Sequence, residues 1–213
     1  KTMKDWIVQI GGDQPFPFLV IDNWYDKETE KSVWSELDFL STKNKKEQLR
    51  AENTIVARKE DGTTLGKSYR WYPDAIYTEE GRAYSPITQS KNLFRTEEFH
   101  EIIEHITPQC RSFTATDFDT SIISYYEDND YYEAHHDKFM WTSLTWFYRE
   151  PKKFTGGNLK FTEPNYEINV KHNRMLMFPC YYLHEVLPIK TKKFKEMGNG
   201  RYTITHFFYS GNV

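Results

Sequence analysis

The chain has 213 residues, of which 38% are hydrophobic and 17% aromatic, a composition typical of a folded domain rather than a disordered chain. Its 28 basic residues nearly balance its 31 acidic residues, and the net charge of −3 argues against a protein that mainly binds nucleic acid. No apolar run approaches the ~20 residues of a membrane-spanning helix, and no signal peptide is visible. We therefore expect a cytoplasmic protein without membrane contact.

Only two cysteines are present, Cys110 and Cys180, and neither belongs to a CxxC motif. They are too few for a disulfide framework. We expect two buried thiols in a reducing compartment, with a single bridge between them as the alternative.

The first half of the chain carries the helical signals. Residues 15–25 predict an extended apolar segment, because prolines disfavour a helix at its start. Residues 26–40 predict a helix with a plausible N-cap, an acidic first turn and one apolar face. The polar residues 41–53 should end this helix or form a loop. A second amphipathic helix is expected over 97–107.

Two further segments of the first half have unusual compositions. Residues 67–86 are rich in tyrosine, tryptophan, arginine and proline, and we expect a packed surface loop there. The alternative is a clamp that holds an extended ligand on aromatic rings. The charged residues 43–50 predict a solvated face.

From about residue 113 the apolar pattern changes to a period of two, which predicts strands. These strands are β-branched and aromatic, and turn sequences such as EDND, TGG and GNG separate them. They cover residues 120–126, 142–148, 158–163, 166–170, 174–179, 184–189 and 201–209. Helices followed by many short strands indicate an α+β, mainly β fold, a sandwich or barrel with supporting helices and with a jelly roll among the options.

The segment YEAHHDKF carries the first candidate for chemistry. His135 and Asp137 are two residues apart, so on a strand they point to the same face, and His136 points to the other. His184 begins a later strand. Two histidines and one carboxylate can form the facial triad that binds non-haem Fe(II) and leaves positions open for ligands. An HxD pair alone is also explained by an ordinary hydrogen bond.

A candidate anion-binding residue begins the last strand. Arg201 shares a face with Thr203 and Thr205 by period two. An arginine that points into a barrel needs an anionic partner, and a carboxylate held through two hydrogen bonds suits it best. The alternative is a surface arginine whose stem packs on the strand. The glycine pair in GGNLKF, residues 156–161, indicates a bend or a close backbone approach.

Taken in order, HxD, GGxLxF, FP, HEVLPI and RYTIT resemble the iron(II)- and 2-oxoglutarate-dependent dioxygenases, specifically their prolyl 4-hydroxylase-like branch, over residues 116–209. The resemblance implies a double-stranded β-helix, a jelly-roll or cupin-like barrel with supporting N-terminal helices. It also implies a single dioxygenase domain over residues 1–213. Residues 1–112 would supply an N-terminal strand and the helices, and residues 113–213 the jelly-roll core with the iron site.

The resemblance assigns roles to individual residues. His135, Asp137 and His184 match the iron ligands. Arg201 matches the residue that binds the distal carboxylate of 2-oxoglutarate, and Tyr125 matches a tyrosine that lines the cosubstrate pocket.

The connection between His184 and Arg201 is longer than the family usually has, so residues 190–200 predict a lengthened hairpin loop. A register slip of one residue there would turn Arg201 outward. Less suitable alternatives for its role are Lys190, Lys192 and Lys193, and Tyr148 is a further candidate for contact with the cosubstrate.

The implied activity is hydroxylation of an unactivated C–H bond, with release of succinate and CO2. The implied cofactors are Fe(II), 2-oxoglutarate and O2, with ascorbate as an optional addition. The expected substrate is a prolyl residue of a protein or peptide. The alternatives are a free amino acid or other small metabolite, a different divalent metal in the same site, and a non-catalytic jelly-roll binding module.

Overall fold

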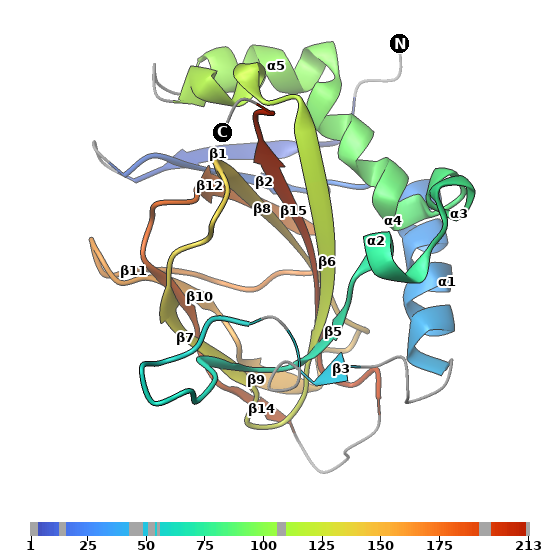
Figure 1. The fold of residues 1–213 in the computed structure, drawn as a ribbon. Helices are drawn as coiled ribbons and strands as arrows, with labels where there is room; N and C mark the ends of the chain where they lie inside the picture. Colours follow the sequence, from blue (N-terminus) through green and yellow to red (C-terminus); the bar gives the residue numbers. More distant parts are fainter. Residues whose placement is uncertain are drawn as a thin grey trace.

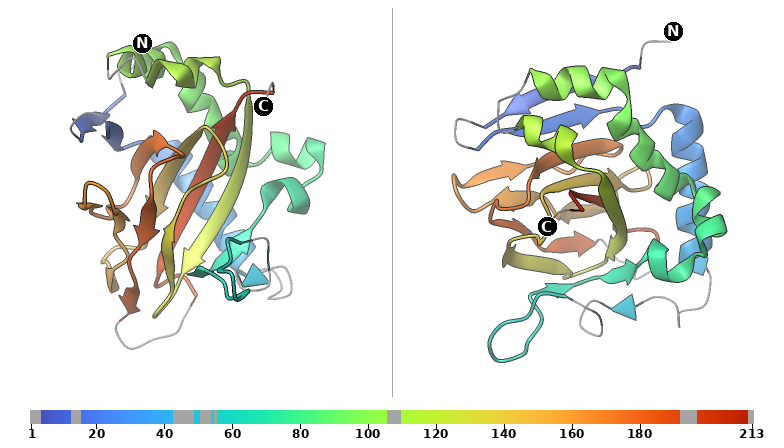
Figure 2. Two further views of the ribbon diagram at one scale, coloured as in Figure 1. Left: turned by 60° about the vertical axis from the view of Figure 1, so that its left-hand side comes forward. Right: turned by 45° about the horizontal axis from the view of Figure 1, so that its top comes forward.

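Two antiparallel sheets face each other, and helices cover the outer side of the larger one (Figures 1 and 2). The computed structural model describes residues 4–12, 16–42, 49–50, 54, 56–105, 110–191 and 197–211. The paired sheets form the double-stranded β-helix that the sequence predicted, and the described strands do not close into a single hydrogen-bonded barrel.

The larger sheet contains most of the strands. In spatial order these are β1 (Ile7–Gly11), β2 (Phe18–Asp22), β12 (Arg174–Pro179), β8 (Trp141–Phe147), β15 (Arg201–Tyr209), β6 (Phe118–Tyr126), β5 (Tyr69–Trp71) and β3 (Leu49–Arg50). The smaller sheet contains β11 (Tyr166–Ile168), β10 (Leu159–Phe161), β13 (His184–Val186), β7 (Tyr131–His135) and β4 (Gly66–Lys67). A separate pair joins β14 (Ile189–Thr191) to β9 (Phe154–Gly156).

The helices come from the first half of the chain. They are α1 (Lys27–Thr42), α2 (Pro73–Ile76), α3 (Glu79–Ala83), α4 (Pro86–Gln89) and α5 (Glu97–Glu104), with the 3-10 helices η2 (Ser90–Arg95) and η3 (Cys110–Ala115). The predicted helix over 26–40 is confirmed, because the Asp26 carboxylate caps α1 by accepting a hydrogen bond from the Thr29 amide at 2.8 Å. The second predicted helix is also confirmed. It ends at Glu104, and residues 106–109 lie outside the described ranges.

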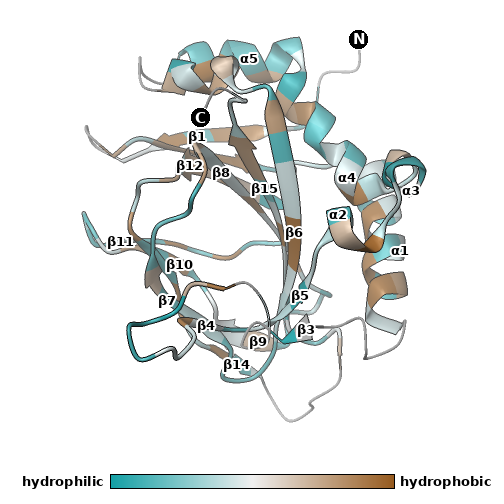
Figure 3. Ribbon diagram, in the orientation of Figure 1, coloured by the Kyte–Doolittle hydropathy of each residue, from teal (hydrophilic) through white to brown (hydrophobic). Residues whose placement is uncertain are grey.

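Two apolar cores hold these layers together. One lies between the helices and the outer face of the larger sheet, where Val33 and Leu37 of α1 meet Phe147 and Tyr202. The other lies between the sheets and includes Leu144. Figure 3 shows both apolar and polar residues along the helices, as expected for helices with one face on a sheet.

The predicted surface loop over 67–86 is wrong. Tyr69–Trp71 pair with β6 as β5, and Pro73 occupies the first turn of α2, where its missing N–H is tolerated. The preceding Gly66–Lys67 pair with β7 of the other sheet. One short segment therefore joins both sheets along one side. The charged residues 43–48 lie outside the described ranges.

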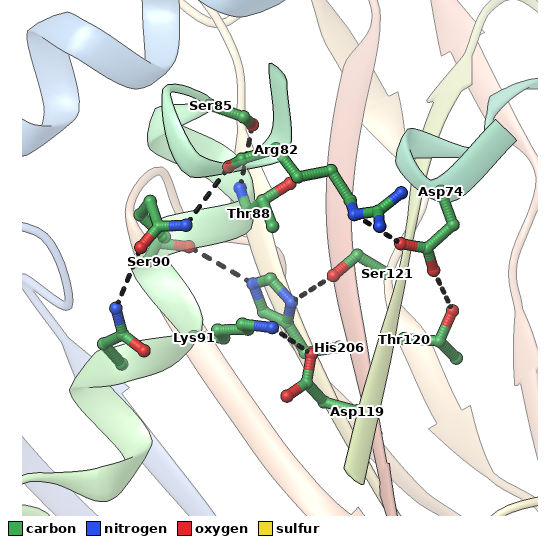
Figure 4. Close-up of polar contacts among 12 residues, drawn as sticks. Asp74, Arg82, Ser85, Thr88, Ser90, Lys91, Asp119, Thr120, Ser121 and His206 are labelled. Carbon is green, nitrogen blue, oxygen red and sulfur yellow. Dashed lines mark hydrogen bonds and ion pairs between the residues drawn. The ribbon is translucent and has the colours of Figure 1, made fainter. Parts of the chain in front are cut away.

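A buried polar cluster joins the larger sheet to the helices (Figure 4). His206 of β15 is fully buried, with Nδ1 at 2.7 Å from the Ser121 hydroxyl and Nε2 at 3.2 Å from the Ser90 hydroxyl. Ser90 donates its own proton to the Ile87 carbonyl and accepts one from Tyr25, so Nε2 of His206 must be the donor. The imidazole is therefore neutral and accepts from Ser121 through Nδ1.

Candidate metal and cosubstrate site

Three potential metal ligands converge between the two sheets. His135 ends β7 and pairs directly with His184, the first residue of β13, and Asp137 follows two residues after His135. One ligand atom from each of the three residues lies within 4.8 Å of the others. The Nε2 atoms of His135 and His184 lie 3.7 and 3.6 Å from the Asp137 carboxylate oxygens. His136 is exposed on the opposite side of the strand, as period two requires.

Backbone carbonyls orient both imidazoles. Nδ1 of His135 lies 2.8 Å from the Glu133 carbonyl, and Nδ1 of His184 lies 2.9 Å from the Tyr182 carbonyl. Because a carbonyl oxygen can only accept, each Nδ1 carries the proton. Each Nε2 therefore presents its lone pair toward Asp137, which is the orientation a metal ligand needs.

The electrostatics of the cluster also suit a metal. Burial, reinforced by the neighbouring His184, lowers the pKa of His135 well below its ordinary value, although Asp137 acts in the opposite direction. The ring is therefore neutral and able to coordinate. The Thr142 hydroxyl donates to Oδ2 of Asp137 at 2.6 Å and fixes the carboxylate. Two neutral imidazoles and one carboxylate are the donor set that non-haem Fe(II) takes in a facial triad.

Arg201 closes a cavity of about 80 Å³ that His135, Asp137 and His184 also line. The arginine is 1% exposed, and its guanidinium lies 4.4 Å from the ring centre of Tyr126. Its Nη1 donates to the Gly157 carbonyl, whereas its Nε has no hydrogen-bond partner in the described structure. Burial lowers the pKa of Arg201 to about 10, because Tyr126 only partly offsets the loss of hydration. A carboxylate in the cavity would satisfy this group.

Comparison with known proteins now agrees with the donor set and the cavity. Residues 121–209 match the 2OG-Fe(II) oxygenase superfamily. The matched stretch contains all three potential metal ligands and Arg201. The resemblance that the sequence motifs indicated is therefore confirmed, and a family of this description uses Fe(II) and 2-oxoglutarate. No curated protein matches the sequence.

Solved structures share the fold of these oxygenases at low identity. A Pseudomonas putida prolyl-4-hydroxylase is 16% identical with a TM-score of 0.58, covering 91% of this chain and 92% of its own. A viral collagen prolyl hydroxylase from Paramecium bursaria Chlorella virus-1, solved with 2OG, is 12% identical with a TM-score of 0.54 and coverages of 91% and 95%. A Neurospora crassa protein in complex with alpha-KG and 5-formyluracil is 12% identical with a TM-score of 0.50 and coverages of 88% and 72%. These similarities establish the fold and leave the substrate open.

Tyr125 does not line the oxygenase pocket. Its side chain belongs to the core under the helices, where its hydroxyl accepts hydrogen bonds from the Gly198 and Gly200 amides, each at 2.9 Å. The neighbouring Tyr126 faces the cavity instead, directly across β15–β6 from Arg201. Counting along the period-two pattern from Arg201 through this pairing would have selected Tyr126.

Other predicted contacts also lie away from the pocket. Tyr148 packs against Phe154 and His172 and does not line the cavity. Lys190 is exposed and donates to the Asn129 side chain. Lys192 and Lys193 lie outside the described residues. Cys110 and Cys180 are both buried free thiols.

The sequence interpretation missed a second arginine in the cavity. Arg70 of β5 is 7% exposed and lines the same space as Arg201. Its guanidinium lies 5.0 Å from the ring centre of Tyr132, and that ring stacks on His135 with centres 3.7 Å apart. The only available signal was the arginine within the aromatic run YRWY, which fixes neither a strand nor a direction.

A wider groove adjoins the cavity. It has a volume of about 770 Å³, and Asp137 lines both spaces. Phe139 and Tyr181 border it and are 37% and 61% exposed. This groove is therefore the open side from which a ligand can approach Asp137. In the described part of the chain, no helix has the length and apolar character to cross a membrane.

Proposed function

We propose that the chain is an Fe(II)- and 2-oxoglutarate-dependent dioxygenase that hydroxylates an unactivated C–H bond and releases succinate and CO2. The observation that carries the proposal is the cluster of His135, Asp137 and His184 within 4.8 Å, beside a buried cavity that also contains Arg201. The N-terminal strands complete the larger sheet, so we further propose that residues 1–213 act as one domain.

The proposed metal ligands are His135, Asp137 and His184, each held in place by its own hydrogen bond. The chemistry that bound Fe(II), 2-oxoglutarate and O2 supply is oxidative decarboxylation coupled to insertion of one oxygen atom into a C–H bond. The protein supplies geometry and electrostatics for this chemistry. The carbonyls behind the imidazoles keep both Nε2 atoms deprotonated, and Thr142 prevents the carboxylate from rotating.

Arg201 is the proposed partner of the distal carboxylate of 2-oxoglutarate. Its unpaired Nε and low exposure mean that an anion gains a charge-assisted hydrogen bond with little competition from water. Tyr126 lies beside the guanidinium, and we assign it the role that the sequence gave to Tyr125. Leu144, Leu159 and other apolar side chains line the cavity and limit water near the reacting atoms.

The proposed substrate is a prolyl residue of a protein or peptide, as the names of two structural neighbours suggest. The groove beside Asp137 is open enough to admit a peptide. A free amino acid or other small metabolite is the second candidate, and the buried charge of Arg70 favours it.

The proposal is tested by anaerobic titration with Fe(II) and then 2-oxoglutarate. We expect the visible charge-transfer band of a chelated iron–oxoacid complex in the wild type. The band should be absent in His184→Ala and should require at least about tenfold more 2-oxoglutarate in Arg201→Gln. Arg95→Gln is the matched control, because it removes the same charge from a guanidinium that lies over Phe113 and Phe208. A folded wild-type protein without the band would refute the proposal.

A further inference from the structure

The cavity contains more positive charge than the proposed cosubstrate neutralises. Arg70 and Arg201 both line it, and both are at least nine-tenths buried. Nε of Arg70 has no hydrogen-bond partner in the described structure, and the described residues give it no ion pair with a carboxylate. A buried guanidinium without an anion is unfavourable, so this arrangement points to a ligand that supplies one.

The surroundings of Arg70 supply only weak compensation. The groups whose charges act on it are tyrosines, namely Tyr72, Tyr126 and Tyr132. The guanidinium lies over the Tyr132 ring at 5.0 Å, and such a contact is worth less than a hydrogen-bonded ion pair. The protein therefore holds the cation in place without neutralising it.

A count of charges in the loaded site leads to the same conclusion. Divalent iron and the two arginines bring four positive charges, whereas Asp137 and the 2-oxoglutarate dianion bring three negative charges. One positive charge remains in a buried space. A substrate with one carboxylate would neutralise it, and a substrate without an anionic group would not.

Arg70 is also placed apart from Arg201. Arg70 pairs with Ser124 on β6, whereas Arg201 pairs with Tyr126 from the other side of the same strand. The ring under Arg70 stacks on His135, so this guanidinium stands beside the metal ligands. Arg201 instead reaches the Gly157 carbonyl. The two cations can thus bind two different carboxylates.

We propose that Arg70 binds a carboxylate of the primary substrate, which makes that substrate a small carboxylic acid such as a free amino acid rather than an internal prolyl residue. This inference rests on the proposed function and assigns Arg201 alone to 2-oxoglutarate.

The first experiment separates the two carboxylates. The affinity for 2-oxoglutarate is measured from the anaerobic charge-transfer band in the wild type, Arg70→Gln, Arg70→Lys and Arg201→Gln. We expect Arg70→Gln to stay within about threefold of the wild type, while Arg201→Gln loses about tenfold or more. A loss of tenfold or more in Arg70→Gln would overturn the inference, because Arg70 would then hold the cosubstrate.

The second experiment measures recognition of the substrate acid. The twenty free amino acids and their amides are titrated calorimetrically into protein that contains Mn(II) and 2-oxoglutarate. We expect at least one acid to bind the wild type about ten- to hundredfold more tightly than its amide. Arg70→Gln should lose this preference, Arg70→Lys should keep part of it, and Arg95→Gln should leave it unchanged.

The outcomes distinguish the two proposals. A wild type that prefers no acid over its amide, or an Arg70→Gln variant that keeps the full preference, would overturn the role of Arg70. A wild type that prefers an acid through Arg70 but shows no charge-transfer band with Fe(II) would refute the proposed oxygenase function and leave the carboxylate site standing.

Discussion

Replacement of His206 with glutamine should flatten the dependence of folding stability on pH. The wild-type imidazole is fully buried, and burial, with a smaller effect of Lys91, lowers its pKa from 6.5 to about 3. Below about pH 6.5 the unfolded chain binds a proton here that the folded chain does not. The free energy of unfolding therefore falls as the pH falls. At about 1.4 kcal/mol per unit, this residue alone removes about 2.7 kcal/mol between about pH 8 and pH 4.5.

The assay is urea unfolding followed by tryptophan fluorescence at several pH values across that window. Glutamine stays neutral throughout and can still donate to Ser90 and accept from Ser121, so the variant keeps the contacts and loses the titration. The Lys91–Asp119 ion pair beside the site remains in both proteins. His105→Gln, at an exposed position, is the control and should keep the wild-type slope. Equal slopes for the wild type and His206→Gln would refute the reasoning.

Three further changes test other contacts. Thr142→Val removes the hydrogen bond to Asp137 and should weaken metal binding by about tenfold or more, measured by Mn(II) titration; unchanged affinity would count against this role. Gly157→Ala should lower the free energy of unfolding by about 1–2 kcal/mol. The residue has φ +73°, and a Cβ atom would lie 2.7 Å from Ile189, so an unaffected urea midpoint would contradict the packing. Glu36→Gln should cost about 1–2 kcal/mol, because this buried carboxylate accepts three hydrogen bonds near the start of α4; wild-type thermal stability would exclude that contribution.

The sequence predicted the parts of the site that depend on local periodicity. His135 and Asp137 share a face because they are two residues apart on one extended segment. Arg201 lines the cavity with Thr203 and Thr205 for the same reason. The helix over 26–40 could be placed because an N-cap, an acidic first turn and an apolar face all lie within one short stretch.

The sequence could not predict contacts that depend on pairing between distant segments. Arg70 reaches the cavity only because a strand of three residues joins β6, more than fifty residues further along the chain. Such a strand is too short to show periodicity. The choice between Tyr125 and Tyr126 depended on a single step of register, which reverses the direction of the side chain. The terminal strand β1 was missed because four of its five residues are exposed.

The segment that pairs with both sheets has a mechanical consequence. Gly66–Lys67 are hydrogen-bonded to β7 and Tyr69–Trp71 to β6, so the sheets are bound along one side like the covers of a book at its spine. To spread the covers there, two sets of backbone hydrogen bonds must break together. The width of the cavity at Arg70 is thus set by the main chain and is the same before and after a ligand arrives. A ligand that fits this width binds without first ordering that wall, and one that is too wide cannot widen it.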